Sequence, residues 1–173
     1  MKKLFAAVLI MAMAVSSVAF AGYSDEYKAK HPARVHVKTE QDLSGKVVTT
    51  TTYNVFWNKN FSLHVRKSPD YKYAFIQYAY MDKRWMFYDG FNWGDGNQVH
   101  NLKLFIDPIR KVDGTMVYER IMAAVDPVEL KSATIIHAHS HQGGYQVMIN
   151  LSDPKWTEWK SALEDADKIL NDK

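Results

Sequence analysis

Turn signals recur along most of the chain at intervals of about 8 to 12 residues, and this spacing limits the fold more than any other feature. Segments rich in β-branched and aromatic residues lie between them, such as VVTTTTYNVFW at 47–57 and YKYAFIQYAY at 71–80. The turns contain proline, glycine and aspartate, for example SPD at 68–70 and VDG at 112–114. Short strands at this spacing predict a mainly β fold, either an antiparallel β sandwich or an open barrel.

The C-terminal segment departs from this pattern, because DPKWTEWKSALEDADKIL at 153–170 has the spacing of a helix. Asp153 suits the N-cap position, and Pro154 suits the first position inside the helix. The apolar residues recur every three or four positions: Trp156, Trp159, Leu163, Ala166 and Leu170. The sequence therefore predicts one C-terminal amphipathic helix over 154–170 that packs on the sheet, with both tryptophans in the core rather than on a ligand surface.

The N-terminal residues have the layout of a bacterial secretory signal peptide. Lys2 and Lys3 precede an uncharged, mostly apolar run, and AFA at 19–21 supplies the small residues of a cleavage site. The run is shorter than the ~20 residues that a spanning helix needs, which disfavours an uncleaved anchor. We therefore expect that residues 1–21 are cleaved and that no transmembrane segment remains. The mature protein would be periplasmic or secreted, with a loose leader over 22–33 and a single β-rich domain over 34–173.

The charge balance of the mature chain is nearly neutral. The full sequence has 22 basic and 19 acidic side chains, and the predicted signal peptide removes two lysines and no acid, which leaves 20 against 19. No basic run remains that would indicate binding to nucleic acid or to an anionic membrane. Cysteine is absent, which excludes a lipid-anchored lipoprotein and disulfides. The core alone must stabilise the domain, which is feasible at ~150 residues.

Three histidines alternate in the stretch IIHAHSHQGGY. Because side chains alternate between the two faces of a strand, His137, His139 and His141 would share one face. The pair Gly143-Gly144 is a strong signal for a two-residue hairpin turn. The register that this turn sets would sort the apolar residues of both strands onto one face, so that the histidines line the other, exposed face.

This histidine face offers part of a metal site. Neighbouring histidines on one face lie ~6.6 Å apart and can share an ion, whereas His137 and His141, at ~13 Å, are too distant for one compact centre. The predicted hairpin places Met148 opposite His139 and no carboxylate beside them. Imidazole with a thioether favours copper over zinc. A metal site among His137, His139, His141 and Met148 is thus one interpretation, and a solvated histidine face is the other.

The segment HAHSHQGG also resembles the HxHxDHxGG signature of the metallo-β-lactamase superfamily, which would imply a di-metal hydrolase. The aspartate of that signature is missing here, and the spacing is one residue short. No histidine follows His141, so the downstream ligands of that family have no counterpart. The sequence therefore predicts that the chain is not a member.

A second candidate site lies over residues 88–97, where aromatic residues fall beside the glycine-rich segment FNWGDGN. Exposed aromatic rings beside amide and carboxylate groups can stack on sugars or hold a peptide. The candidate ligand-binding residues are Tyr88, Phe91, Trp93, Asp95 and Asn97. The carboxylates and amides here lack the spacing of a calcium loop, so a glycine-rich turn is the favoured interpretation of GDGN.

No pattern in the sequence assembles an enzyme, because no Ser–His–Asp order, paired-carboxylate motif or phosphate loop is present. We therefore predict an exported, non-catalytic binding or envelope-associated domain without a cofactor. Its partner would be a protein, a peptide or a glycan. The alternative is a periplasmic metal-binding protein that holds copper or zinc on its His-x-His strand.

Overall fold

A computed structural model describes residues 34–56, 60–141 and 146–172. Its strands form a six-stranded sheet of order β1-β2-β3-β4-β8-β7 and a four-stranded sheet of order β10-β9-β5-β6. The strands of the larger sheet are β1 Val35–Gln41, β2 Val47–Phe56, β3 Phe61–Lys67, β4 Lys72–Asp82, β7 Ile109–Asp113 and β8 Met116–Val125. Those of the smaller sheet are β5 Gly90–Gly94, β6 Val99–Leu102, β9 Ile135–His139 and β10 Gln146–Asn150. The helices are α3 Pro127–Leu130, the 3₁₀ turn Pro154–Trp156 and α4 Glu158–Asn171.

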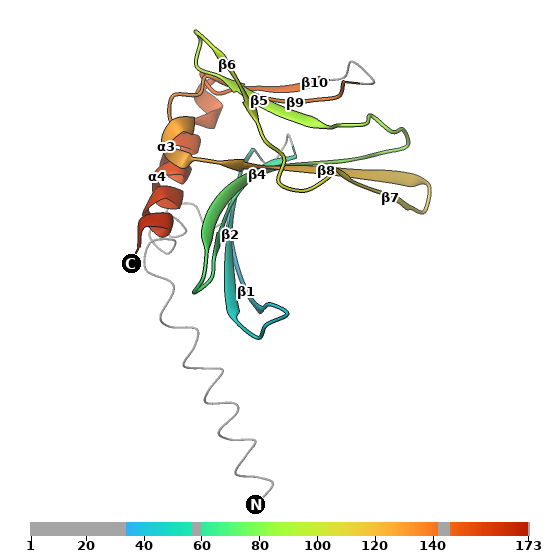
Figure 1. The fold of residues 1–173 in the computed structure, drawn as a ribbon. Coiled ribbons are helices and arrows are strands. Elements are labelled where there is room, and N and C mark those ends of the chain that lie inside the picture. The colour runs from blue at the N-terminus through green and yellow to red at the C-terminus, as the bar shows by residue number, and fades with distance from the viewer. Residues whose placement is uncertain (1–33, 57–59, 142–145, 173) are drawn as a thin grey trace, which may run out of the picture.

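The predicted mainly β, antiparallel fold with one C-terminal helix is confirmed. Every strand pair in both sheets is antiparallel. The larger sheet curls so strongly that it forms a half-barrel, and the smaller sheet lies across one end of it (Figure 1). Helix α4 runs along one side of both sheets (Figure 1). The signal peptide and leader predicted for 1–33 lie outside the described residues.

One continuous core joins the two sheets and α4. Phe61 on β3 and Phe91 on β5 meet with ring centroids 6.0 Å apart, which brings the sheets into contact. Trp159 and Leu163 are buried on the apolar face of α4. Burial of each such side chain stabilises the fold by ~1.5–3 kcal/mol. Trp156 is buried as well, so the prediction that both tryptophans belong to the core is confirmed.

The start of the C-terminal helix differs from the prediction. Asp153 and Pro154 begin a 3₁₀ turn, in which the Asp153 carbonyl accepts the N–H of Trp156 at 2.9 Å. The α-helix itself begins at Glu158 after Thr157, whose side chain makes no capping hydrogen bond. The short helix α3 does have a side-chain cap, because the Asp126 carboxylate accepts the N–H of Val128 at 2.8 Å.

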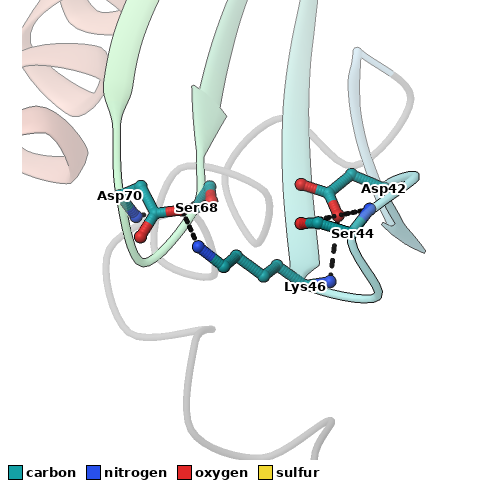
Figure 2. Close-up of polar contacts among 5 residues, drawn as sticks. All are labelled: Asp42, Ser44, Lys46, Ser68 and Asp70. Carbon is teal, nitrogen blue, oxygen red and sulfur yellow. Dashed lines mark hydrogen bonds and ion pairs between the residues drawn. The ribbon is translucent and has the colours of Figure 1, made fainter.

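Polar contacts fix the helix and the turns of the larger sheet. The hydroxyl of buried Tyr53 on β2 donates a hydrogen bond to the Asp165 carboxylate of α4 at 2.5 Å, which fixes the helix against the sheet. Figure 2 shows the turns after β1 and β3. In the first, Asp42 accepts the N–H of Lys46 at 3.0 Å, and the Lys46 ammonium then pairs with Asp70 in the second.

The segment between β4 and β5 is irregular. The structure has no regular strand from 83 to 89, and the chain pairs again only from Gly90. Phe87 adopts a left-handed conformation with φ of 57°, which a regular strand does not accommodate. Among the described residues, no helix has the length and apolar character that a membrane crossing requires.

Candidate metal centre

Strand β9 lies between β5 and β10, and this arrangement sets the neighbours of its histidines. His139 pairs with Gly90 on one side and with Gln146 on the other. Ile136 and Ala138 of the same strand are fully buried, so alternation turns His137 and His139 to the opposite face. The predicted sorting of β9 into an apolar face and a histidine face is therefore confirmed.

The register of the hairpin is shifted by two residues from the prediction. Met148 pairs with His137 rather than with His139, and the last pair of the hairpin joins His139 to Gln146. A shift of two preserves which residues share a face, because the period of a strand is two. The proposed turn at Gly143-Gly144 lies outside the described residues.

The imidazole of His139 lies directly over the backbone of Gly90. A Cβ atom added to Gly90 would stand 2.2 Å from Cε1 and 2.6 Å from Nε2 of this ring. Carbon atoms in contact are normally ≈ 3.5–4.0 Å apart. The absence of a side chain at Gly90 is therefore what allows the His139 ring to extend across β5.

Asp89, immediately before β5, brings a carboxylate to this ring. Its backbone N–H donates to the His139 carbonyl at 3.1 Å, which extends the ladder between β5 and β9. Its Oδ1 accepts the backbone N–H of His141 at 3.0 Å and lies 2.9 Å from the Nδ1 of His141. The rings of His139 and His141 meet edge to face, with centroids 4.8 Å apart.

These three side chains form a candidate metal centre. Asp89, His139 and His141 each offer one ligand atom, and the three atoms lie within 4.8 Å of one another. Ligand atoms on a tetrahedral ion with bonds of ~2.0–2.1 Å are about 3.3 Å apart. A small side-chain rotation closes the remaining gap, and His141 is free to make it, because its side chain is 74% exposed.

The protonation of the histidines suits a metal ligand, which must be neutral. Burial lowers the pKa of His139, the positive charge of a protonated His141 lowers it further, and the carboxylate of Asp89 opposes both. Burial also lowers the pKa of His137, with a smaller contribution from His139. Both strand imidazoles are therefore neutral around pH 7, with the lone pair available.

His137 and Met148, two of the four predicted metal ligands, lie outside this cluster. His137 stands between Asn92 on β5 and Met148 on β10. Its Nε2 is buried and has no hydrogen-bond partner in the part of the chain that the structure describes. The sulfur-bearing side chain of Met148 is 49% exposed. The structure thus unites two of the three predicted histidines, adds a carboxylate to them and separates the methionine from His139.

A buried carboxylate holds the segment that leads to Asp89. Glu119 on β8 is 1% exposed, and its two oxygens accept the backbone N–H groups of Phe87 at 3.1 Å and Tyr88 at 3.0 Å, together with that of Met86. The Arg110 guanidinium lies 3.6 Å from Glu119 and donates to the Tyr88 carbonyl at 3.1 Å. Glu119 therefore stabilises the left-handed residue Phe87 and fixes the path into β5.

The second candidate site, over 88–97, is not an exposed loop. Tyr88, Phe91 and Trp93 are 3%, 1% and 5% exposed, so the prediction that these rings face solvent is wrong. The physical reason is that FNWG forms β5, whose alternate residues point into the core. Asp95 accepts the N–H of Asn97 at 2.8 Å and caps the turn, and Asn97 is exposed. Ligand binding by this region stays a prediction.

Asp89 is the residue that reasoning from the sequence missed as a partner of the histidines. It lies 52 positions before His141, and only the pairing of β5 with β9 brings the two together. The one available signal was the dipeptide Asp89-Gly90, an acid followed by a residue that permits close approach. Comparison of the chain with family models, with curated proteins and with solved structures found no match.

Proposed function

We propose that this chain is an exported, non-catalytic protein that binds one divalent transition-metal ion through Asp89, His139 and His141. The single observation that carries the proposal is the convergence of a carboxylate and two imidazoles, whose ligand atoms lie within 4.8 Å of one another. Export is supported by the signal-like residues 1–21.

The ligand set favours copper or zinc over magnesium or calcium. Two imidazole nitrogens and one carboxylate oxygen are typical of zinc and copper sites, whereas the hard cations prefer oxygen alone. For a given set of nitrogen and oxygen ligands, copper binds more tightly than zinc. We therefore expect Cu²⁺ to bind more tightly than Zn²⁺, with both ions at the same site.

Three protein ligands leave at least one coordination position for water or an exchanging ligand. The side chain of His141 is 74% exposed, which supports an open position on the solvent side. An open, solvent-facing site is suited to taking up and releasing an ion, as a carrier or buffer does. A closed structural site would instead have four protein ligands.

Metal titration of the mature protein tests the proposal. The protein, stripped of metal with a chelator, is titrated with Cu²⁺ and Zn²⁺ by calorimetry, and bound metal is measured by elemental analysis after dialysis. We expect one equivalent of metal, and we expect His139→Ala and Asp89→Asn to abolish stoichiometric binding. The matched control is His36→Ala, which removes an exposed histidine from β1, far from the site in the sheet order.

Two results would contradict the proposal. The first is the absence of stoichiometric metal in the unaltered protein. The second is binding that survives His139→Ala or Asp89→Asn. A loss of binding in His137→Ala with retention in Asp89→Asn would instead support the His137 and Met148 pair that face each other on β9 and β10.

Binding of a glycan or peptide by residues 88–97 is the second candidate function. Burial of its three rings removes the stacking surface that motivated it and leaves Asp95 and Asn97 as the accessible polar groups. A glycan and peptide array tests it, with Asn97→Ala as the variant, and binding that this variant leaves unchanged would exclude the site.

A further inference from the structure

The end of the half-barrel formed by β4, β8 and β7 carries a cavity that the metal centre does not use. Its volume is about 440 Å³, and its lining residues are Met81, Lys111, Val112, Asp113, Tyr118 and Arg120. In β8, Val117 and Glu119 are buried in the core, so Tyr118 and Arg120 point to the other face of the sheet. The cavity therefore opens on the side of the sheet that lies opposite the core.

Arg120 is the residue that makes this cavity chemically unusual. Its Nε is buried, yet it has no hydrogen-bond partner among the residues that the structure describes. A buried guanidinium N–H without an acceptor is costly, because about 1–3 kcal/mol of desolvation is left uncompensated. Arg120 also lines the cavity, so its guanidinium brings a positive charge to it.

A second cation lies beside Arg120. Lys111 pairs with Tyr118 across β7 and β8, and its ammonium lies 5.5 Å from the centre of the Tyr118 ring. Arg120 is two positions further along the same face of β8, about 6.6 Å away along the strand. Lys111, Tyr118 and Arg120 all line the cavity, so two cationic side chains contribute to one lining.

The surroundings reinforce the positive potential. Met81 lines the cavity near the end of β4, and it is followed in the chain by the exposed residues Asp82, Lys83 and Arg84, one acid and two bases. The carboxylate that opposes these charges in the cavity is Asp113, which is exposed at the end of β7. No sequence run reveals this basic surface, because three separate segments contribute to it.

We propose that this cavity is a binding site for the phosphate group of a small phosphomonoester. A planar guanidinium can donate two parallel hydrogen bonds to phosphate, and a nearby ammonium neutralises the second charge. A cavity of 440 Å³ holds a phosphate with a short polar extension. The same chemistry is offered by a soluble phosphoester and by the headgroup of phosphatidic acid.

Two binding assays on the chelator-treated mature protein test the proposal and separate the two sources. Calorimetry with glycerol 3-phosphate measures binding of a soluble phosphomonoester, which we call the soluble arm. Flotation with phosphatidylcholine vesicles, with and without phosphatidic acid, measures binding to the lipid headgroup, which we call the lipid arm. We expect saturable binding in at least one arm that weakens as salt is added, because added ions screen the charges. Because the metal has been removed, the result is independent of the metal centre.

Charge variants locate the binding. Arg120→Met and Lys111→Met should each weaken it by about tenfold or more, the effect of losing a charge-assisted hydrogen bond. Asp113→Asn should tighten it, because the opposing carboxylate is removed. The control is Lys168→Met, which removes an exposed lysine from α4. Lys111 and Asp113 are exposed, so these variants report on binding even if Arg120→Met reduces stability.

The proposal is overturned if neither arm shows saturable binding. It is also overturned if Lys168→Met weakens binding as much as Lys111→Met does, since the attraction would then be a general effect of charge. Binding in the soluble arm alone assigns the site to a soluble phosphoester. Binding only to vesicles that contain phosphatidic acid assigns it to a lipid headgroup.

Discussion

Replacement of Gly90 by alanine tests the metal centre without removing any of its ligands. The new Cβ would stand 2.2 Å from the Cε1 atom of His139. Carbon atoms in contact need about 3.5 Å, so the ring must withdraw by about 1.3 Å or rotate away from Asp89. Either movement takes one of the three ligand nitrogen and oxygen atoms out of reach of the ion.

The fold itself should tolerate Gly90→Ala. Gly90 does not have a positive φ, so alanine meets no backbone strain there. Alanine in a strand also lowers the entropy of the unfolded chain, which contributes about 0.5–1 kcal/mol in favour of folding. The colliding atoms belong to the half-buried imidazole of His139 and not to backbone, and a side chain can move. We therefore expect a change in unfolding free energy within about 1 kcal/mol.

Metal affinity should fall by about 10–100-fold or more, because displacement of a ligand costs at least as much as loss of a group that orients one. Calorimetry with Cu²⁺ measures the affinity, and urea unfolding measures the stability of the same samples. The matched control is Gly94→Ala on the same face of β5, where the new Cβ would lie 3.1 Å from Ile135 and away from the histidines. Unchanged metal affinity in Gly90→Ala would refute the assignment of His139 as a ligand in its observed position.

Three further outcomes follow from buried groups. Burial and the nearby Arg120 lower the pKa of His64 from 6.5 to about 4. Between these values the unfolded chain binds a proton that the folded chain does not, so unfolding free energy should fall by about 3 kcal/mol as the pH drops from 7 to 4. In His64→Gln, the drop in unfolding free energy between pH 7 and pH 4 should be smaller, and urea unfolding at both pH values measures it. Glu119→Gln removes the buried charge that binds the 86–88 backbone and pairs with Arg110, so we expect a loss of about 2–4 kcal/mol in urea unfolding and weaker metal binding. Leu163→Ala, at a fully buried position on α4, should cost about 2–5 kcal/mol in the same assay and leave metal affinity unchanged.

The fold was predictable because its determinants are local. Turn residues and alternating strand residues lie close together in the chain, so VDG at 112–114 indicates the hairpin of β7 and β8 without knowledge of distant segments. The division of the strands into two sheets was harder to predict from the sequence. The chain leaves the larger sheet after β4, forms β5 and β6, and returns in β7 and β8. No local pattern encodes that excursion.

The aromatic residues of 88–97 show where local reasoning failed. Three glycines near the rings indicate a loop, and a loop would expose them. In the structure, Gly90 and Gly94 are the first and last residues of β5. Gly90 makes room for a side chain of the neighbouring strand. A glycine that serves close packing cannot be distinguished by sequence alone from a glycine that serves flexibility.

The histidine stretch contributes two side chains to the candidate metal centre because its strand ends early. If the strand continued through His141, His139 and His141 would be ~6.6 Å apart and their side chains would project in parallel. No carboxylate would then lie between them. Instead β9 ends at His139, and His141 lies in the turn that follows. The Asp89 carboxylate binds the backbone N–H of His141, and the two rings meet at 4.8 Å between centroids. The same carboxylate thus holds His141 in the turn and adds an oxygen to the two imidazoles of the candidate centre. For this reason Asp89→Asn should abolish stoichiometric metal binding, both by removing a charged ligand and by relaxing the position of His141.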